Sequence, residues 1–165
     1  MPPPANATPT PLPTATPTPL PIELAAQLVN TAEELLDQFL GEDEAIELLD
    51  QALQIYPESA EANYLRGKAK ISQVWGSYEI EINTPEWDSA LLAAVEDFTQ
   101  AILLSPTVAD YWHERGCAQF DRRAYQRSLE GFSAAILLDP FIDDYYYRRG
   151  RSNERIPDRS LEDVK

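Results

Sequence analysis

The segment Asp110-Tyr111-Trp112-His113-Glu114-Arg115-Gly116 returns 34 residues later as Asp144-Tyr145-Tyr146-Tyr147-Arg148-Arg149-Gly150. At the same offset Pro106 matches Pro140, and an earlier, less complete copy of the segment ends at Gly67. The residues between the copies follow the i, i+3, i+4, i+7 apolar spacing of amphipathic helices. A period of 34 residues with two helices that end at a proline predicts an all-α solenoid of stacked helix pairs.

Apolar spacing and three prolines divide the chain into elements. Pro57, Pro106 and Pro140 each follow the end of a helix, because proline cannot continue one. We expect seven helices, at about 22–39, 43–55, 59–77, 85–104, 108–121, 125–138 and 142–155. The expected domains are an extended linker or stalk at 1–21, a solenoid at 22–156 and a C-terminal tail at 157–165. The solenoid comprises three repeats, at about 26–59, 60–108 and 109–142, and a closing half-repeat at 143–156.

These residues resemble the tetratricopeptide-repeat (TPR) family over about residues 23–156. The family's first helix has a large residue and then a small one four positions later, as Trp112 and Gly116 do. Its second helix has small, aromatic and small residues before a proline, which here are Ala94, Phe98, Ala101 and Pro106. Just before the glycine, where the family usually has leucine, this chain has arginine at 66, 115 and 149, and in this it is similar to bacterial members. The resemblance implies a right-handed solenoid of antiparallel helix pairs, with three hairpins and one closing half-repeat.

The second repeat is longer than the others. Pro57 and Pro106 are 49 positions apart, fifteen more than the period, and the extra residues lie within 72–93. We expect Thr84 to cap a helix that begins at Pro85, and both helices of the pair to extend about two turns beyond their neighbours. A short strand or an extended loop is an alternative at 78–82. Trp75 and Trp87 form either a small separate core, which we favour, or a contact surface.

Charge is unevenly distributed along the 165 residues. The chain has 28 Asp and Glu against 13 Lys and Arg, a formal net charge of −15. All of this net charge lies in residues 22–110, whereas residues 111–165 hold ten acids and ten bases. The acidity argues against nucleic acid and anionic membrane surfaces as partners, because both need clustered Lys and Arg. No apolar run reaches ~18 residues, so the sequence predicts no membrane insertion.

Residues 1–21 hold nine of the fourteen prolines and no charged residue. This composition favours polyproline II geometry. Asn6 fits the N-glycosylation sequon, and threonines between prolines are typical of O-glycosylated stalks; the alternative is an unmodified spacer. The candidate glycosylation sites are Asn6, Thr8, Thr10, Thr14, Thr16 and Thr18. Such stalks usually hold a domain away from a cell surface, so we expect an extracytoplasmic protein, at the surface or secreted, with a cytoplasmic location as the alternative.

In the family the concave groove is lined by the first helix of each pair, so the resemblance implies a set of groove residues. Asn30 and Glu34 stand where members that clamp a peptide's C-terminal carboxylate have Lys and Asn, so that clamp is absent. The groove grades from acidic to basic, which suits an extended peptide with a basic and an acidic end. The groove residues are Asn30, Glu34, Glu61, Tyr64, Lys68, Asp110, His113, Asp121, Asp144, Tyr147, Arg151 and Arg155, with Gln27 and Cys117 beside them.

Enzymatic functions find little support. His113 is the only histidine, and Cys117, the only cysteine, lies one helical turn further on. With Asp110 and Asp121 nearby, a Cys–His couple or a metal site is geometrically conceivable, but small Cys residues usually pack as hydrophobes. We therefore expect no catalytic residues, no cofactor and no metal.

The sequence predicts a protein–protein interaction module that a Pro/Thr-rich stalk presents to a protein or peptide partner. The alternative is a structural protein whose solenoids stack head-to-tail into an extracellular fibre or smaller homo-oligomer, the acidic N-terminal end on the arginine-bearing C-terminal end. The candidate assembly surface comprises Tyr145, Tyr146, Arg148, Trp75 and Trp87.

Overall fold

A computed structural model describes residues 20–38, 41–76, 82 and 84–156. The expected stalk up to residue 19, the alternative strand at 78–81 and the tail at 157–165 lie outside these residues. The described parts of the chain contain helices and no strand, as the sequence predicts. The helices are α1 (Pro21–Asp37), α2 (Glu42–Ile55), α3 (Ala60–Gly76), α4 (Pro85–Leu104), α5 (Ala109–Asp121), α6 (Tyr125–Leu138) and α7 (Asp143–Arg155).

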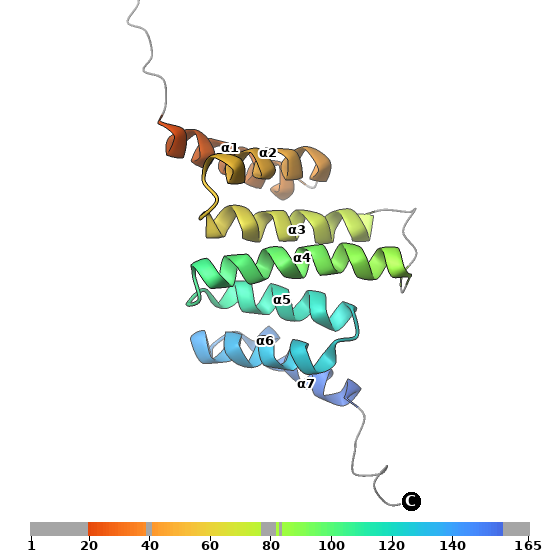
Figure 1. The fold of residues 1–165 in the computed structure, drawn as a ribbon. Helices are drawn as coiled ribbons and strands as arrows, with labels where there is room; N and C mark the ends of the chain where they lie inside the picture. Colours follow the sequence, from red (N-terminus) through yellow and green to blue (C-terminus); the bar gives the residue numbers. More distant parts are fainter. Residues whose placement is uncertain (1–19, 39–40, 77–81, 83, 157–165) are drawn as a thin grey trace, which may run out of the picture.

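The helices stack in chain order, with α1 and α7 at opposite ends (Figure 1). Each helix packs on the next, which gives the hairpins α1–α2, α3–α4 and α5–α6 and a last helix, α7. The odd-numbered helices also contact one another in series: α1 with α3, α3 with α5, and α5 with α7. Among the described residues, α2, α4 and α6 make no such contacts. The odd-numbered helices therefore form one continuous layer, which we call the inner layer, and the even-numbered helices form an outer layer.

Two hairpins are held by a phenylalanine ring that rests on a glycine. Phe98 and Phe132 are fully buried. A Cβ atom added to Gly67 would lie 2.6 Å from the Phe98 ring, and one added to Gly116 would lie 2.9 Å from the Phe132 ring. These two glycines therefore let the paired helices pack closely. Gly150, at the matching position of the next repeat, has no such contact: an added Cβ would meet nothing within 4 Å, and no described helix follows α7.

The helix ends follow the local signals in the sequence. Helices α2, α4 and α6 each end two residues before a proline, and the expected helix ranges agree with the observed ones within about two residues. Thr84 caps α4 as expected, because its Oγ1 accepts a hydrogen bond from the Trp87 amide at 3.2 Å. Within the described residues the second pair is longer than the third: α3 has 17 residues against 13 in α5, and α4 has 20 against 14 in α6. These differences are between one and two turns.

The elongated pair has a small core of its own. Val74, Trp87 and Leu91 are buried together, and the Trp75 ring meets Trp87 edge-on at 4.8 Å. Trp75 remains 57% exposed, whereas Trp87 is 5% exposed. The favoured expectation of a separate core is confirmed for Trp87, and its place on an assembly surface is wrong, because α3 and α4 enclose it.

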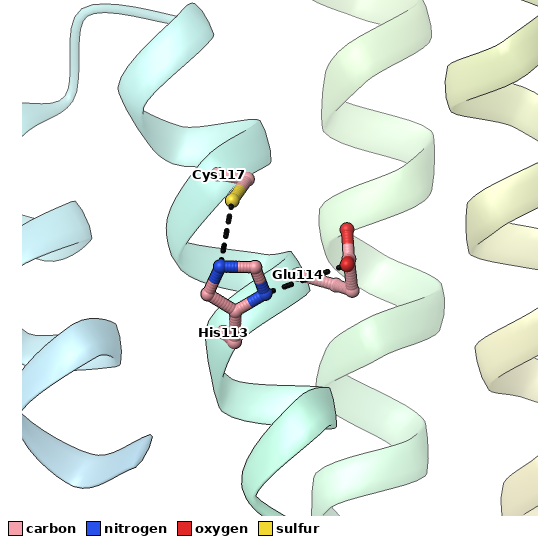
Figure 2. A group of neighbouring side chains, drawn as sticks. All are labelled: His113, Glu114 and Cys117. Atoms are coloured by element: carbon pink, nitrogen blue, oxygen red, sulfur yellow. Dashed lines mark hydrogen bonds and ion pairs between the residues drawn. The ribbon is translucent and has the colours of Figure 1, made fainter. Parts of the chain in front are cut away.

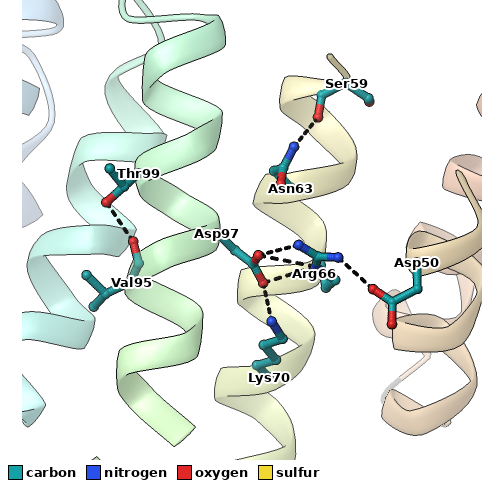
Figure 3. A network of polar contacts seen from close by, with 8 residues as sticks. All are labelled: Asp50, Ser59, Asn63, Arg66, Lys70, Val95, Asp97 and Thr99. Carbon is teal, nitrogen blue, oxygen red and sulfur yellow. Dashed lines mark hydrogen bonds and ion pairs between the residues drawn. The ribbon is translucent and has the colours of Figure 1, made fainter. Parts of the chain in front are cut away.

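A charged network joins the first hairpin to the second (Figure 3). The Arg66 guanidinium donates to buried Asp97 of α4 at 2.6 Å and to exposed Asp50 of α2 at 2.6 Å. Lys70 donates to the second oxygen of Asp97 at 2.6 Å. This network gives Arg66, just before the glycine of the second repeat, a structural role, because its side chain links α3 to both α2 and α4.

Substitution of the glycines tests the packing of Phe98. Gly67→Ala places a methyl group against a ring that is fully buried and cannot move away, so we expect a loss of about 1–3 kcal/mol in the free energy of unfolding. Gly150→Ala is the matched control, because the same change on an open helix face raises helix propensity and adds up to about 1 kcal/mol. Urea denaturation of both variants measures the difference, and equal effects would contradict this packing.

The charged network makes a second prediction. Asp97→Asn leaves two cations without their buried carboxylate, which we expect to cost about 3 kcal/mol. Asp50→Asn removes an exposed partner of the same arginine and should cost less than about 1 kcal/mol. Thermal unfolding of both variants measures the difference, and similar losses of stability would show that the burial of Asp97 does not strengthen its ion pairs.

Candidate functional site

All twelve predicted groove residues lie on the inner layer. Eight are exposed, on α1, α3, α5 and α7, and four are partly buried: Tyr64, His113, Asp121 and Asp144. The exposed residues are Asn30, Glu34, Glu61, Lys68, Asp110, Tyr147, Arg151 and Arg155. Exposure alone does not make a residue free, because exposed Asp110 accepts a hydrogen bond from Tyr145 of α7.

Tyr64 joins α3 to α5. Its ring lies 4.7 Å from that of Tyr111 and 6.0 Å from that of Phe98, and the Lys68 ammonium lies 5.5 Å from its centre. Burial raises the pKa of Tyr64 well above its usual value, and the nearby carboxylates of Glu114 and Asp110 raise it further. Tyr64 is therefore a neutral packing residue between α3 and α5.

Tyr145 joins α7 to α5 in the same way. Its hydroxyl donates to Asp110 Oδ1 at 2.8 Å, and its ring lies 4.9 Å from that of His113. Burial and the hydrogen bond to Asp110 raise the pKa of Tyr145. Tyr145 is only 4% exposed, so its expected place on an assembly surface is wrong. Tyr145 and Tyr111 occupy the same position in successive repeats, and both point toward the preceding inner helix.

His113 lies at the centre of a polar cluster between α5 and α7. Figure 2 shows its ring between Cys117 and Glu114, with Cys117 Sγ 3.6 Å from Nε2 and Glu114 Oε1 3.4 Å from Nδ1. Asp144 Oδ2 of α7 lies 3.0 Å from the same Nε2. Of these two carboxylates, the one closer to the ring comes from the next repeat. Asp110, expected beside His113, instead accepts the hydrogen bond from Tyr145.

Cys117 is not arranged as a nucleophile. Burial and then the carboxylate of Glu114 raise the pKa of Cys117 to about 12, with Asp121 and Asp144 adding to the rise and Arg148 opposing it. The thiol is therefore protonated near neutral pH, whereas a nucleophilic cysteine needs a lowered pKa. Cys117 and His113 are in contact, but the raised pKa of the thiol gives them no support as a catalytic pair.

The arginines of α7 are held against aromatic and acidic neighbours. Arg148 donates to Asp144 at 2.6 Å, and Arg149 lies 5.5 Å from the ring centre of Tyr146. Arg151 lies 5.5 Å from the ring centre of Phe120 and 5.9 Å from that of Tyr147. Of the candidate assembly residues on this helix, Tyr146 is 42% exposed and Arg148 is an exposed residue paired with Asp144.

Charge therefore changes along the inner layer. Helices α1 and α2 at one end contain no Lys or Arg, whereas α7 at the other end contains four arginines. No helix in the described ranges is long and apolar enough to cross a membrane.

Sequence reasoning missed two residues of the inner layer. Tyr111 stacks on Tyr64, and Phe120 lies beneath Arg151, yet neither was among the predicted groove residues. The signal for Tyr111 was present, because Tyr111 and Tyr145 are 34 residues apart and share one position of the repeat. The role of Phe120 depends on an arginine of the next repeat.

No protein-family model matches the sequence, and no curated protein matches it. The fold is similar to that of several solved TPR domains. The first TPR domain of Spaghetti (RPAP3), bound to the HSP90 peptide SRMEEVD, is 15% identical with a TM-score of 0.68, covering 80% of this chain and 92% of that one. The Arabidopsis OM64 TPR domain is 15% identical with a TM-score of 0.70, covering 82% of this chain and 99% of that one.

The second TPR domain of human RPAP3, in complex with the HSP70 peptide SGPTIEEVD, is 17% identical. Its TM-score is 0.67, and the match covers 81% of this chain and 98% of that one. These likenesses agree with the 34-residue repeat and the helix pairs described above. The chain therefore has the tetratricopeptide-repeat fold.

Proposed function

We propose that this chain is a non-enzymatic interaction module whose inner layer binds an extended segment of a protein partner. The observation that carries the proposal is the continuity of the inner layer, which offers exposed polar side chains from four consecutive inner helices. An extended peptide that lies along this layer would contact each helix in turn. The two RPAP3 domains, solved with chaperone peptides, support peptide binding as a use of this fold.

The charges of the layer suggest which peptide would fit. Glu34 and Glu61 are exposed near the α1 end, where α1 and α2 provide no cation. Arg151 and Arg155 are exposed at the α7 end. A partner segment with a basic part and an acidic part would match both ends, and the match would govern specificity and association rate more than affinity. The acidic peptides bound to the RPAP3 domains would meet repulsion at the α1 end.

We also propose that residues 1–21 act as a stalk that holds the solenoid away from a cell surface. The support is compositional: nine prolines, no charge, and the sequon at Asn6. An extracytoplasmic location follows from this reading. Extended, charge-free segments of this kind keep a binding domain accessible without contributing contacts of their own.

Selection of peptides tests the binding proposal. We expect random peptides displayed on phage and selected on the intact protein to carry Lys or Arg at one end. A synthetic copy of a selected peptide should bind several-fold more weakly to a Glu34→Gln, Glu61→Gln variant, because each change removes one attractive charge. The control is Glu47→Gln, Glu96→Gln, which removes two exposed acids from the outer helices α2 and α4. Equal weakening by both variants, measured by calorimetry, would place the contact outside the groove.

A second candidate function is head-to-tail assembly into a fibre. The observation that favours it is that α1, which has no Lys or Arg, and α7, which has four arginines, lie at opposite ends of the stack (Figure 1). Because Trp87 and Tyr145 are buried, the contact would rely on exposed groups such as Tyr146, Arg155 and the acids of α1. Trp75, exposed beside Trp87, would be free for lateral contacts.

Light scattering across salt concentration tests the assembly. If the ends attract each other, particle mass should rise at low salt and fall toward the monomer as the Debye length shrinks from about 30 Å at 0.01 M to about 8 Å at 0.15 M. Arg151→Glu, Arg155→Glu should abolish the rise. A monomer at low salt and high protein concentration would rule out assembly while leaving the peptide-binding proposal intact.

A further inference from the structure

Helix α6 covers one side of α5. A Cβ atom added to Gly116 would lie 2.9 Å from the Phe132 ring of α6, and Gly116 is buried. A Cβ added to Gly131 of α6 would lie 3.0 Å from the carbonyl oxygen of Trp112. The side of α5 on which Trp112 and Gly116 lie is therefore closed by the next outer helix.

Helix α7 repeats this side, and no described helix lies on it. Tyr146 and Gly150 are 34 residues after Trp112 and Gly116. A Cβ added to Gly150 would meet nothing within 4 Å, and Tyr146 is 42% exposed. Arg149 lies 5.5 Å from the ring centre of Tyr146 and has no carboxylate partner among the described residues. We call this surface, formed by Tyr146, Arg149 and Gly150, the open side of α7.

The three described outer helices share a motif of five residues: a small residue, an apolar residue, Glu, a variable residue and a bulky apolar residue. The copies are at 45–49 in α2, 94–98 in α4 and 128–132 in α6. In each copy the small and the bulky residue are buried and the Glu is exposed. In α4 and α6 the bulky residue is the phenylalanine that lies on the glycine of the preceding inner helix.

The same motif returns after α7 as Ser-Leu-Glu-Asp-Val at 160–164, outside the described residues. Helices α2 and α6 begin three residues before the motif, and the residue three before Ser160 is Pro157. Proline is favoured at the first position of a helix, where α1 and α4 also have it. The pattern therefore predicts that an outer helix begins at Pro157.

The variable position of the motif is linked to the arginine that precedes the inner glycine. In α4 this position is Asp97, which accepts a hydrogen bond from Arg66 of α3 at 2.6 Å. In α6 it is Gly131, and Nε of Arg115 on α5 has no hydrogen-bond partner among the described residues. A carboxylate at this position thus pairs with the arginine of the inner helix, and without the carboxylate the arginine lacks that partner.

We propose that residues 157–165 form an outer helix that covers the open side of α7, with Val164 over Gly150 and the Asp163 carboxylate bound to Arg149. Helix α7 would then be the inner helix of a fourth complete pair instead of a closing half-repeat. This contact is independent of the proposed peptide binding, and it would remove part of α7 from the candidate assembly surface.

A valine suits the open side differently from a phenylalanine. The ring atoms that would meet a Cβ on Gly67 or Gly116 are Cδ1, Cε1 and Cζ, and valine lacks all three. Val164 can therefore cover Gly150 and leave room for the methyl group of the Gly150→Ala variant. Isolated helices shorter than about 12–15 residues are marginal in water, so helicity at 157–165 would itself indicate packing on α7.

NMR spectroscopy of the intact chain, labelled with ¹³C and ¹⁵N, tests the contact. We expect the ¹³Cα shifts of residues 158–164 to lie downfield of their random-coil values. We also expect nuclear Overhauser effects between the Val164 methyl groups and the Gly150 Hα atoms. Asp163→Asn should move the ¹³Cα shifts toward random-coil values, because Arg149 loses its carboxylate partner.

The matched control is Glu162→Gln, the same chemical change at the motif position that is exposed in every described copy, and it should leave the shifts unchanged. Random-coil shifts at 158–164 in the wild type, or no Overhauser effect to α7, would overturn the proposal. Equal losses in Asp163→Asn and Glu162→Gln would exclude the pairing with Arg149. Overhauser effects that arise only between differently labelled copies in a mixed sample would place the helix on a neighbouring chain and would equally overturn it.

Discussion

The contact of a phenylalanine ring with a glycine backbone sets the spacing on which the stack depends. At Gly67 and Gly116 the missing side chain leaves the space that the Phe98 and Phe132 rings occupy. Close pairing within these hairpins lets the inner helices reach one another, so that Tyr64 stacks on Tyr111 across two repeats. The inner layer, its aromatic contacts and the cluster at His113 all follow from this spacing.

The fold could be predicted almost fully because its signals are local. Glycine, phenylalanine and proline recur at fixed positions, and each acts through sterics that hold in every copy. The exceptions arise where a position depends on something beyond its own repeat. Gly150 occupies the repeat position of a packing glycine, but no aromatic ring lies against it. Tyr145 belongs to a run of three tyrosines that the sequence suggests is exposed, yet its hydroxyl donates a hydrogen bond to Asp110 of the preceding repeat and the residue is buried.

The groove could be predicted as a set of positions but not as a set of contacts. Spacing along one helix suggested Asp110 and Asp121 as neighbours of His113, whereas the carboxylate closest to its ring belongs to Asp144, 31 residues away. Such pairs depend on the register between repeats, which a single helix does not specify. Arg66 is a similar case, because its two acceptors lie on α2 and α4. The repeat pattern thus predicts the fold but not the contacts between repeats.

A double-mutant cycle on Gly67 and Phe98 tests the central constraint most directly. If the ring and the missing Cβ compete for the same space, Gly67→Ala should cost markedly less in a Phe98→Leu background than in the wild type. The coupling in the free energy of unfolding should then reach about 1 kcal/mol or more. Costs that simply add, within about 0.3–0.5 kcal/mol, would show that the two residues are independent and would contradict the account.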